Sequence, residues 1–88
     1  MSREDDFEKA QVTVKALPKT PTSAELLELY GWYKQATLGD VEGARPGMMD
    51  FKGRAKFDAW LSRKGADREA AMAKYVEVVE RLSAKYGR

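Results

Sequence analysis

The chain has 88 residues, and its 16 basic and 14 acidic side chains give a formal net charge of +2, which argues against a general nucleic-acid binder. The length suits one small domain with a single hydrophobic core, spanning residues 1–88. There is no cysteine and no histidine, which excludes disulfides, thiolate nucleophiles, the commonest zinc ligands and the usual acid/base group of neutral pH.

The first expected helix begins near Ser2, whose hydroxyl can cap it, with Asp5 three residues further on as in a capping box. Apolar side chains then recur at helical spacing: Phe7, Ala10, Val14 and Leu17. Pro18 ends this helix and begins a short, stiff linker that runs to Pro21.

A second helix opens at residues 22–25, where a Thr-Ser-Ala-Glu run has the form of a capping box. Its apolar residues are Leu26, Leu27, Leu29, Tyr30 and Tyr33. We expect this helix to run to about Leu38, because Gly39 fits a C-terminal cap.

Residues 39–49 form the longest expected connection, since they contain three glycines, a proline and several polar residues. Loops of this length are often functional, or they cross from one end of a domain to the other. In the second case the flanking helices run nearly parallel.

Two further helices complete the expected fold. Asp50 can cap the third, which is expected to end at Arg63-Lys64-Gly65, where two cations and a glycine suit a helix C-terminus. Asp67 can cap the fourth. The fourth helix carries a narrow apolar stripe suited to packing on its neighbours, made of Met72, Tyr75, Val79, Leu82 and Tyr86.

No alternating β pattern competes with these helices, so the fold class is all-α. No apolar stretch approaches the roughly 20 residues needed to span a bilayer, and the acidic N-terminus does not resemble a signal peptide. We therefore expect a cytoplasmic protein without stable membrane insertion.

Tyr30, Tyr33 and Lys34 stand at i, i+3 and i+4 of the second helix, which places them on one surface patch. The phenol rings can stack on a base, and the hydroxyls and the ammonium can bind phosphate oxygens. The alternative is that the tyrosines belong to the core and that Lys34 is an ordinary solvated charge.

Lys52 and Lys56 share a face of the third helix, and the pattern puts Phe51, Ala55 and Ala59 on a different stripe. Like charges at this spacing repel each other by a few tenths of a kcal/mol. A bound polyanion would reverse the sign of that effect, although a solvated basic face is the favoured interpretation when this helix is considered alone.

Single residues elsewhere give weaker signals. Tyr75 lies on the apolar stripe of the fourth helix but carries a hydroxyl that a buried site must satisfy. Lys15 suits a helix C-terminus with or without a ligand. Trp32 and Trp60 are more typical of packing than of ligand contact, and Glu28 is expected to face solvent at the edge of an apolar surface.

These stretches resemble the acyl-CoA-binding protein family over nearly the whole chain. The matching positions are Phe7, Ala10, residues 30–40, Arg45-Pro46-Gly47-Met48, Asp50-Phe51-Lys52-Gly53, Ala55-Lys56, Asp58-Ala59-Trp60, Lys64-Gly65, Ala71-Met72, Tyr75 and Lys85-Tyr86-Gly87. A Tyr-x-x-Tyr-Lys pattern alone is far less specific than a match of this length.

The resemblance implies a single acyl-CoA-binding domain, folded as a four-helix bundle of up-down-down-up type. It implies non-catalytic binding, buffering and intracellular transport of medium- and long-chain fatty acyl-CoA esters, as part of lipid transport and fatty acid metabolism. It implies no cofactor and no metal. The partners would be the acyl-CoA esters themselves and the enzymes that produce or consume them, with the protein acting as a monomer and binding no nucleic acid.

The resemblance also implies the ligand-binding residues. Tyr30, Lys34 and Lys56 would meet the 3′-phosphate and adenine, and Leu26 and Leu27 would border the acyl chain. The full set is Lys15, Leu27, Tyr30, Gly31, Trp32, Tyr33, Lys34, Lys52, Lys56 and Tyr75.

Three positions depart from the family pattern. Phe57 replaces a usual tryptophan, Arg54 replaces a common lysine, and Glu28 stands where an apolar residue is often found. The change at Glu28 is expected to affect the edge of the acyl groove. None of the three removes a proposed phosphate partner.

Two other classes of protein compete with this reading. A helical nucleic-acid-binding module would bind through the lysines of the third helix, with a steep dependence on salt. A protein-interaction module would use the aromatic patch to bind a partner. An enzyme ranks last, because the chain offers no histidine or cysteine as base or nucleophile, and no nucleophile-elbow or P-loop motif.

Overall fold

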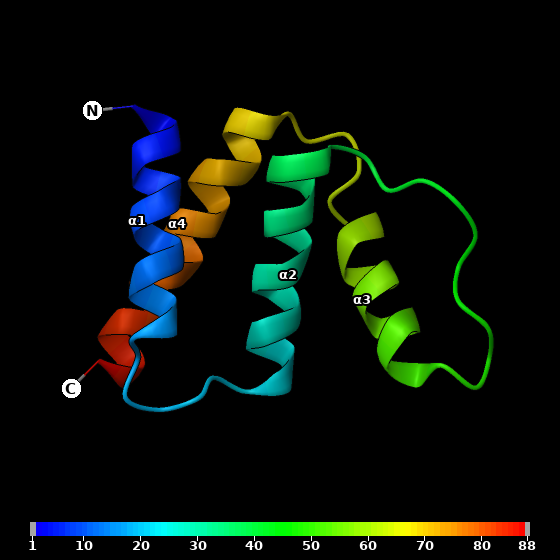
Figure 1. The fold of residues 1–88 in the computed structure, drawn as a ribbon, viewed down its shortest axis with the longest axis horizontal. Helices are drawn as coiled ribbons and strands as arrows, with labels where there is room; N and C mark the ends of the chain where they lie inside the picture. Colours follow the sequence, from blue (N-terminus) through cyan, green and yellow to red (C-terminus); the bar gives the residue numbers. More distant parts are fainter. Residues whose placement is uncertain (1, 88) are drawn as a thin grey trace.

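The structure, a computed structural model, describes residues 2–87, which form four helices: α1 (Arg3–Lys15), α2 (Ser23–Leu38), α3 (Phe51–Leu61) and α4 (Arg68–Tyr86). Met1 and Arg88, the two ends of the expected domain, lie outside the described residues. In Figure 1, α1 and α4 run downwards while α2 and α3 run upwards. The expected all-α, up-down-down-up arrangement is therefore confirmed.

All four helices begin at the cap that the sequence predicts. The side chains of Ser2, Thr22, Asp50 and Asp67 each accept a hydrogen bond from the backbone N–H three residues further on. At Thr22 the capping box is complete, because the Glu25 carboxylate also accepts a hydrogen bond from the Thr22 N–H, at 2.8 Å. These local hydrogen bonds satisfy backbone donors that a helix N-terminus leaves free.

Two helix ends lie earlier than expected. α1 ends at Lys15 and not at Leu17, because a residue that precedes proline is sterically disfavoured in the helical conformation. α3 ends at Leu61 and not at the Arg63-Lys64-Gly65 run. There the Ser62 hydroxyl donates to the Ala59 carbonyl at 2.8 Å, which competes with the backbone ladder, and tighter turns carry the chain onward to α4.

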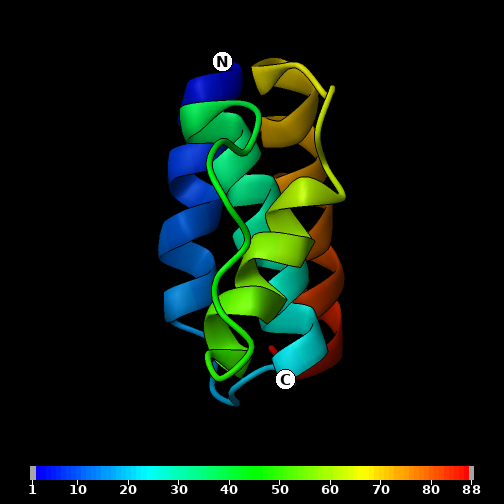
Figure 2. The ribbon, with the colours of Figure 1, turned by 90° about the vertical axis from the view of Figure 1, so that its right-hand side faces the viewer.

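Helix α4 is the centre of the packing. It lies against both α1 and α2, and α3 lies against α2 only. Among the helices, α3 lies nearest the viewer in Figure 2, with α1 and α4 on opposite sides. The stripe of α4 behaves as predicted: Tyr75, Val79 and Leu82 are buried, and Met72 and Tyr86 are half-buried against the same core. The other members of the core cluster are Phe7, Ala10, Leu29, Ala36, Ala71 and Val78.

The long connection from α2 to α3 crosses the molecule from its upper to its lower end, so that the two helices run in the same direction (Figure 1). The Arg45 guanidinium donates two hydrogen bonds to the Asp58 carboxylate, at 2.9 and 2.6 Å, and so attaches this connection to α3. This contact lowers the pKa of Asp58. Val41, buried in the same connection, adds an apolar anchor.

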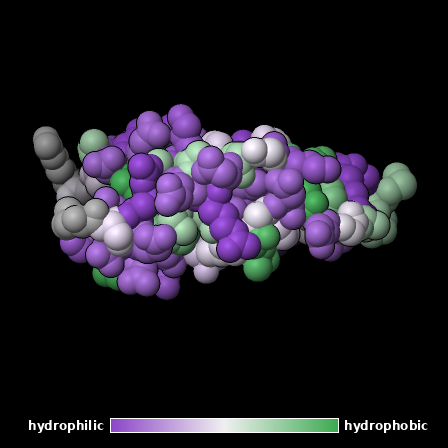
Figure 3. Space-filling model, turned by 90° about the horizontal axis from the view of Figure 1, so that it is seen from above, coloured by the Kyte–Doolittle hydropathy of each residue, from purple (hydrophilic) through white to green (hydrophobic). Residues whose placement is uncertain are grey.

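A hydrogen-bonded junction ties the upper ends of α2, α3 and α4 together. The buried Gln35 amide donates to the Ala66 carbonyl and to the Asp40 carboxylate, both at 2.8 Å. The Gly65 N–H also donates to Asp40, and these hydrogen bonds lower the pKa of that carboxyl. Seen from above, this end of the molecule presents a mostly hydrophilic surface with small hydrophobic patches (Figure 3).

A second polar network joins the N-terminus of α2 to the C-terminus of α4. The Glu25 carboxylate accepts hydrogen bonds from Lys85 Nζ at 2.9 Å and from the Tyr86 hydroxyl at 2.6 Å. Together with the backbone of Thr22, these donors lower the pKa of Glu25 to about 2. One side chain therefore caps α2 and also fixes it to α4.

None of the helices within residues 2–87 combines the length and the apolar character needed to cross a membrane.

Candidate functional site

A groove between α2 and α3 collects several of the predicted binding residues. Its volume is about 340 Å³, and we call it the α2–α3 groove. It is lined by Ser23, Leu26, Leu27, Tyr30, Lys52, Ala55 and Lys56. The floor and walls are mostly carbon, with two ammonium groups from α3 opposite the tyrosine of α2. Such a groove suits a ligand with an apolar part and an anionic part.

Two lysines converge on Tyr30 at this groove. Lys56 Nζ lies 5.4 Å from the centre of the Tyr30 ring, and Lys34 Nζ lies 5.7 Å from it. Lys34 is also 5.7 Å from the ring of Trp60, whose Nε1 donates to the Gly39 carbonyl at 2.7 Å. The rings therefore hold two ammonium groups, one from each helix, beside one phenol.

This cluster has the chemistry of an anion site next to a flat ring. Cations over aromatic faces are attracted to them, yet they keep donors for an anionic ligand. Two like charges near one ring repel each other, and a phosphate between them would replace that repulsion with charge-assisted hydrogen bonds. Within the described residues, neither Lys34 nor Lys56 forms a salt bridge that a ligand would have to displace.

Three aromatic rings form a second cluster, to which α1, α2 and α4 each contribute one. The centroid of Phe7 lies 5.9 Å from that of Tyr33 and 5.1 Å from that of Tyr75, and the two tyrosines are 6.2 Å apart. Stacked and edge-on pairs at these distances are favourable beyond their burial. Tyr33 is partly exposed at 36%, whereas Tyr75 is 5% exposed. The cluster therefore connects the core to the surface.

Burial raises the pKa of the Tyr75 phenol, and the neighbouring Tyr33 raises it further. The phenol therefore stays protonated and keeps a hydrogen to donate. Among residues 2–87, no group forms a hydrogen bond with this hydroxyl. The hydroxyl oxygen is not buried together with the ring, so it can donate a hydrogen bond to a ligand oxygen within reach.

Gly31 belongs to the contact between helices and not to the groove. A Cβ at this position would lie 2.5 Å from the carbonyl oxygen of Ala59 on α3, closer than real contacts allow. The absence of a side chain thus lets α3 approach α2 closely, which is what brings Lys56 to Tyr30. Gly31 acts on the site through the position of α3.

Two other predicted residues also lie apart from the groove. The ring of Trp32 packs under Arg63, whose Cζ is 4.6 Å from the ring centre, and it borders a hollow between α2 and α4. Lys15 is exposed at the end of α1. The structure therefore brings together Leu27, Tyr30, Lys34, Lys52 and Lys56, places Tyr33 and Tyr75 in the aromatic cluster, and does not bring Gly31, Trp32 or Lys15 into the groove.

Ala55 corrects the expected division of α3 into two stripes. It lines the groove together with Lys52 and Lys56, because a small side chain between two lysines lets the cavity extend down to the helix surface. Phe51, expected on the same stripe as Ala55, is 75% exposed. The sequence signals for Ala55 are its place in the Ala55-Lys56 match and its small size, and neither singles it out as a lining residue.

Glu28 differs from the expectation, and Phe7 makes a contact that the sequence does not predict. Phe7 is buried on α1, as its apolar spacing predicts, but its contact with both tyrosines depends on the tertiary fold. Glu28 is half-buried and accepts a hydrogen bond from Arg81 of α4, so it points away from the groove and not to its edge. Its proposed influence on the acyl chain therefore has no support in its position.

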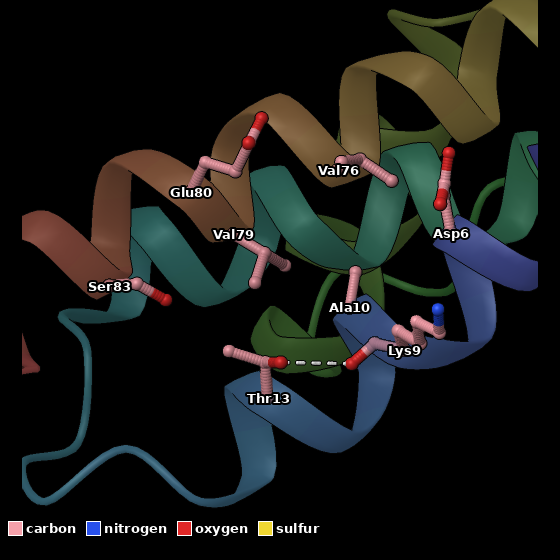
Figure 4. Close-up of a pocket in the computed structure, with 8 residues that line it drawn as sticks. All are labelled: Asp6, Lys9, Ala10, Thr13, Val76, Val79, Glu80 and Ser83. Atoms are coloured by element: carbon pink, nitrogen blue, oxygen red, sulfur yellow. Dashed lines mark hydrogen bonds between the residues drawn. The ribbon is translucent and has the colours of Figure 1, made fainter.

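A larger hollow of about 540 Å³ lies between α1 and α4. Figure 4 shows its lining, in which the Thr13 hydroxyl donates to the Lys9 carbonyl at 3.0 Å and Ser83 projects from the opposite side. The Ser83 Oγ is buried without a hydrogen-bond partner in the structure. None of the predicted binding residues borders this hollow, and its acidic side chains Asp6 and Glu80 do not suit an anionic ligand. The α2–α3 groove is therefore the better candidate site.

No group of three or more acidic side chains within residues 2–87 is arranged to hold a metal ion.

Comparison with known proteins finds a family model and relatives that match this chain in sequence. A family model described as "Acyl CoA binding protein" matches residues 4–79. An acyl-CoA-binding protein homolog of Drosophila melanogaster is 46% identical over 82 residues, which cover 93% of this chain and 95% of the relative.

Solved structures show the same likeness in three dimensions. The crystal structure of Oryza sativa acyl-CoA-binding protein 2 is 40% identical, with a TM-score of 0.90, and the match covers 96% of this chain and 93% of the rice chain. The crystal structure of ACBP from Moniliophthora perniciosa is 47% identical, with a TM-score of 0.87, and the match covers 97% and 83% of the two chains. Both the sequence and the fold of this chain are similar to those of these proteins.

Proposed function

The chain belongs to the acyl-CoA-binding protein family, and from this premise we propose that it reversibly binds, buffers and carries medium- and long-chain fatty acyl-CoA esters. The observation that carries the proposal is the convergence of Lys34 and Lys56 on Tyr30 beside an apolar groove. An acyl-CoA ester needs both features in one place, because a polyanionic nucleotide is joined to a hydrocarbon chain. No second function has an observation of its own to favour it.

In this proposal the nucleotide end binds at the Tyr30 cluster. The adenine stacks on an aromatic face, and the 3′-phosphate accepts hydrogen bonds from Lys34 and Lys56. Each charge-assisted hydrogen bond of this kind contributes roughly 1.5 to 3 kcal/mol. Lys52 stands one turn before Lys56 on the groove wall and would meet a further phosphate oxygen.

The acyl chain would lie in the α2–α3 groove, against Leu26, Leu27 and Ala55. Leu26 is 44% exposed, so covering it with an acyl chain removes apolar surface from water. Burying a methylene group contributes roughly 0.8 kcal/mol. Affinity should therefore rise with chain length until the groove is filled, while the nucleotide fixes the orientation.

Tyr33 and Tyr75, which belong to the aromatic cluster with Phe7, complete the proposed site. The Tyr75 hydroxyl offers a proton donor, and the partly exposed Tyr33 ring offers a face. Lys15 at the exposed end of α1 is a further candidate for a ligand contact, at the edge of the site.

In this proposal the protein carries acyl-CoA esters and does not cleave them. Cleavage of a thioester needs an activated nucleophile or a positioned base, and the chain has no histidine or cysteine to fill either role. Binding requires no cofactor and no second subunit, so we propose that a monomer acts in the cytoplasm. There it would exchange ligand with enzymes that produce or consume acyl-CoA.

Calorimetric titration with free CoA, a series of acyl-CoA esters and the matching free fatty acids tests the proposal. We expect affinity to increase along the series, free CoA to bind more weakly than its long-chain ester, and free acids to bind poorly. Equal binding of CoA and of its long-chain ester would contradict the groove assignment. Rapid release of CoA from the ester would contradict carriage without catalysis.

A further inference from the structure

Three exposed apolar side chains stand close together where the long connection enters α3. Met48, Met49 and Phe51 are 75%, 88% and 75% exposed, and they are the most exposed large apolar residues in the described part of the chain. We call these three residues the apolar tip. Single exposed apolar side chains are ordinary, but a cluster of them marks a surface that meets another apolar phase or partner.

Local hydrogen bonds hold the backbone of the apolar tip in one shape. The Asp50 N–H donates to the Gly47 carbonyl at 3.0 Å, which closes a turn around the two methionines. The Asp50 carboxylate then caps α3 by accepting a hydrogen bond from the Gly53 N–H at 2.9 Å. The turn lies at the lower right of Figure 1, at one extremity of the molecule. The apolar tip is therefore a protrusion whose backbone is held by hydrogen bonds, and it can meet a flat surface without rearrangement.

Several lysines lie at the same end of the bundle. Lys52 and Lys56 follow the tip on α3, and Lys15 and Lys19 lie at the end of α1 and in the linker that crosses the lower end of the molecule (Figure 1). Among residues 2–87, none of these four lysines forms a salt bridge.

Two carboxylates lie near these lysines. Glu25 is paired with Lys85, and Asp50 caps α3. Asp50 keeps its negative charge, but the four lysines outnumber it, so this end of the molecule can attract an external anion.

We propose that the apolar tip inserts into the headgroup region of a membrane that contains anionic phospholipids, while the adjacent lysines meet lipid phosphates. Apolar side chains beside cations are the combination that binds such an interface without crossing it. The charge complementarity with an anionic surface distinguishes this partner from a neutral one.

Docking in this way would open the α2–α3 groove towards the lipid. Lys52 directly follows Phe51 and lines the groove, so the tip and the groove are continuous along the first turn of α3. An acyl chain could then pass between bilayer and groove with little exposure to water. This consequence rests on the proposed function, whereas the docking itself does not.

Flotation of the full chain with phospholipid vesicles, in the absence of acyl-CoA, tests the docking. One set of vesicles contains phosphatidylcholine and phosphatidylserine, and the other contains phosphatidylcholine alone. We expect binding to the anionic vesicles, weaker binding to the neutral ones, and a loss of binding as salt is raised. The Met48→Ser/Met49→Ser/Phe51→Ser variant should reduce the partition coefficient by roughly tenfold or more, because three apolar anchors are removed.

A matched control replaces exposed apolar residues outside the tip. Val12 and Leu38 are 69% and 59% exposed, and the Val12→Ser/Leu38→Ser variant should bind vesicles like the unmodified chain. An equal loss in both variants, or no loss in the tip variant, would overturn the proposal. Failure of the unmodified chain to bind anionic vesicles would also overturn it, and would leave a protein as the partner of the tip.

A solution titration with acyl-CoA separates the two proposals. The tip variant should keep its helical circular dichroism and its affinity for the dissolved ester. If the tip variant loses that affinity, the tip is part of the ligand site and the docking role is overturned. If no form of the chain binds the ester, the proposed function fails while the vesicle result still stands.

Discussion

Lys56 Nζ lies 5.4 Å from the centre of the Tyr30 ring, although the two residues belong to different helices and are separated by the long connection. This contact joins the basic face of α3 to the aromatic face of α2. It depends on the close approach of the two helices at Gly31 and Ala59. The predictions below test each part of this arrangement.

Replacing the converging lysines should weaken recognition of the 3′-phosphate. For Lys34→Ala or Lys56→Ala we expect a loss of roughly 1.5 to 3 kcal/mol in acyl-CoA binding, about 10- to 150-fold, because one charge-assisted hydrogen bond is removed. Isothermal titration with an acyl-CoA ester and with its 3′-dephospho analogue measures the effect. The variants should discriminate less between the two ligands than the unmodified chain does.

Lys74→Ala is the matched control for these variants, because Lys74 lies on the exposed face of α4 and pairs with Glu77 at 3.6 Å. Its affinity for both ligands should equal that of the unmodified chain. Undiminished discrimination in the Lys34 and Lys56 variants would refute their assignment.

Removing the Tyr75 hydroxyl should affect ligand binding and leave the fold intact. Tyr75→Phe keeps the buried ring and deletes a hydroxyl that has no hydrogen-bond partner within residues 2–87. Stability in guanidinium chloride should therefore stay the same or increase, while acyl-CoA affinity should fall by about 1 kcal/mol, roughly fivefold.

Tyr86→Phe should behave in the opposite way. The Tyr86 hydroxyl donates to Glu25 at 2.6 Å, so its loss should lower the free energy of unfolding without changing ligand affinity. If Tyr75→Phe keeps full affinity, the phenol does not contact the ligand.

A methyl group at Gly31 should push α3 away from α2. The added Cβ of Gly31→Ala would lie 2.5 Å from the Ala59 carbonyl oxygen. Because that oxygen belongs to the backbone, the clash can be relieved only if one of the two helices moves. Overpacking costs about 1 to 3 kcal/mol, and the better helix propensity of alanine returns up to about 1 kcal/mol. Guanidinium chloride denaturation should show a net loss of stability, accompanied by weaker acyl-CoA binding.

Gly47→Ala provides the comparison, because a Cβ at Gly47 meets no atom within 4 Å. This variant should be neutral or slightly stabilising. A Gly31→Ala protein as stable as the Gly47→Ala protein would show that the contact between the helices can adjust.

Acid should weaken the attachment of α2 to α4. The pKa of Glu25 is lowered from 4.5 to about 2 by hydrogen bonds from Tyr86, Lys85 and Thr22. The unfolded chain therefore binds a proton at this position before the folded chain does. The stabilisation is fully present above about pH 4.5 and is lost as the pH falls towards about 2.

Denaturation curves recorded across that pH range test whether the free energy of unfolding falls as the pH falls. Glu25→Gln should be less stable than the unmodified chain at neutral pH and should show a shallower decline in acid. Glu77→Gln, on an exposed ion pair of α4, should follow the unmodified chain. A Glu25→Gln protein with the full acid dependence would assign that dependence to other carboxylates.

Much of this fold follows from interactions between residues three or four positions apart. The caps at Ser2, Thr22, Asp50 and Asp67 are hydrogen bonds of this range, and all four are found where the sequence predicts them. The same range places Tyr30 beside Lys34 and Lys52 beside Lys56. The sequence could therefore predict the helices, the apolar stripe of α4 and the two halves of the candidate site.

Contacts between distant parts of the chain could not be predicted from residue spacing. The meeting of Lys56 with Tyr30, the cluster of Phe7 with Tyr33 and Tyr75, and the pairing of Glu28 with Arg81 all join different helices. They depend on how closely and at what angle whole helices pack, which many side chains decide together. The periodicity of one helix shows which residues share a face, and only the assembled bundle decides what that face meets.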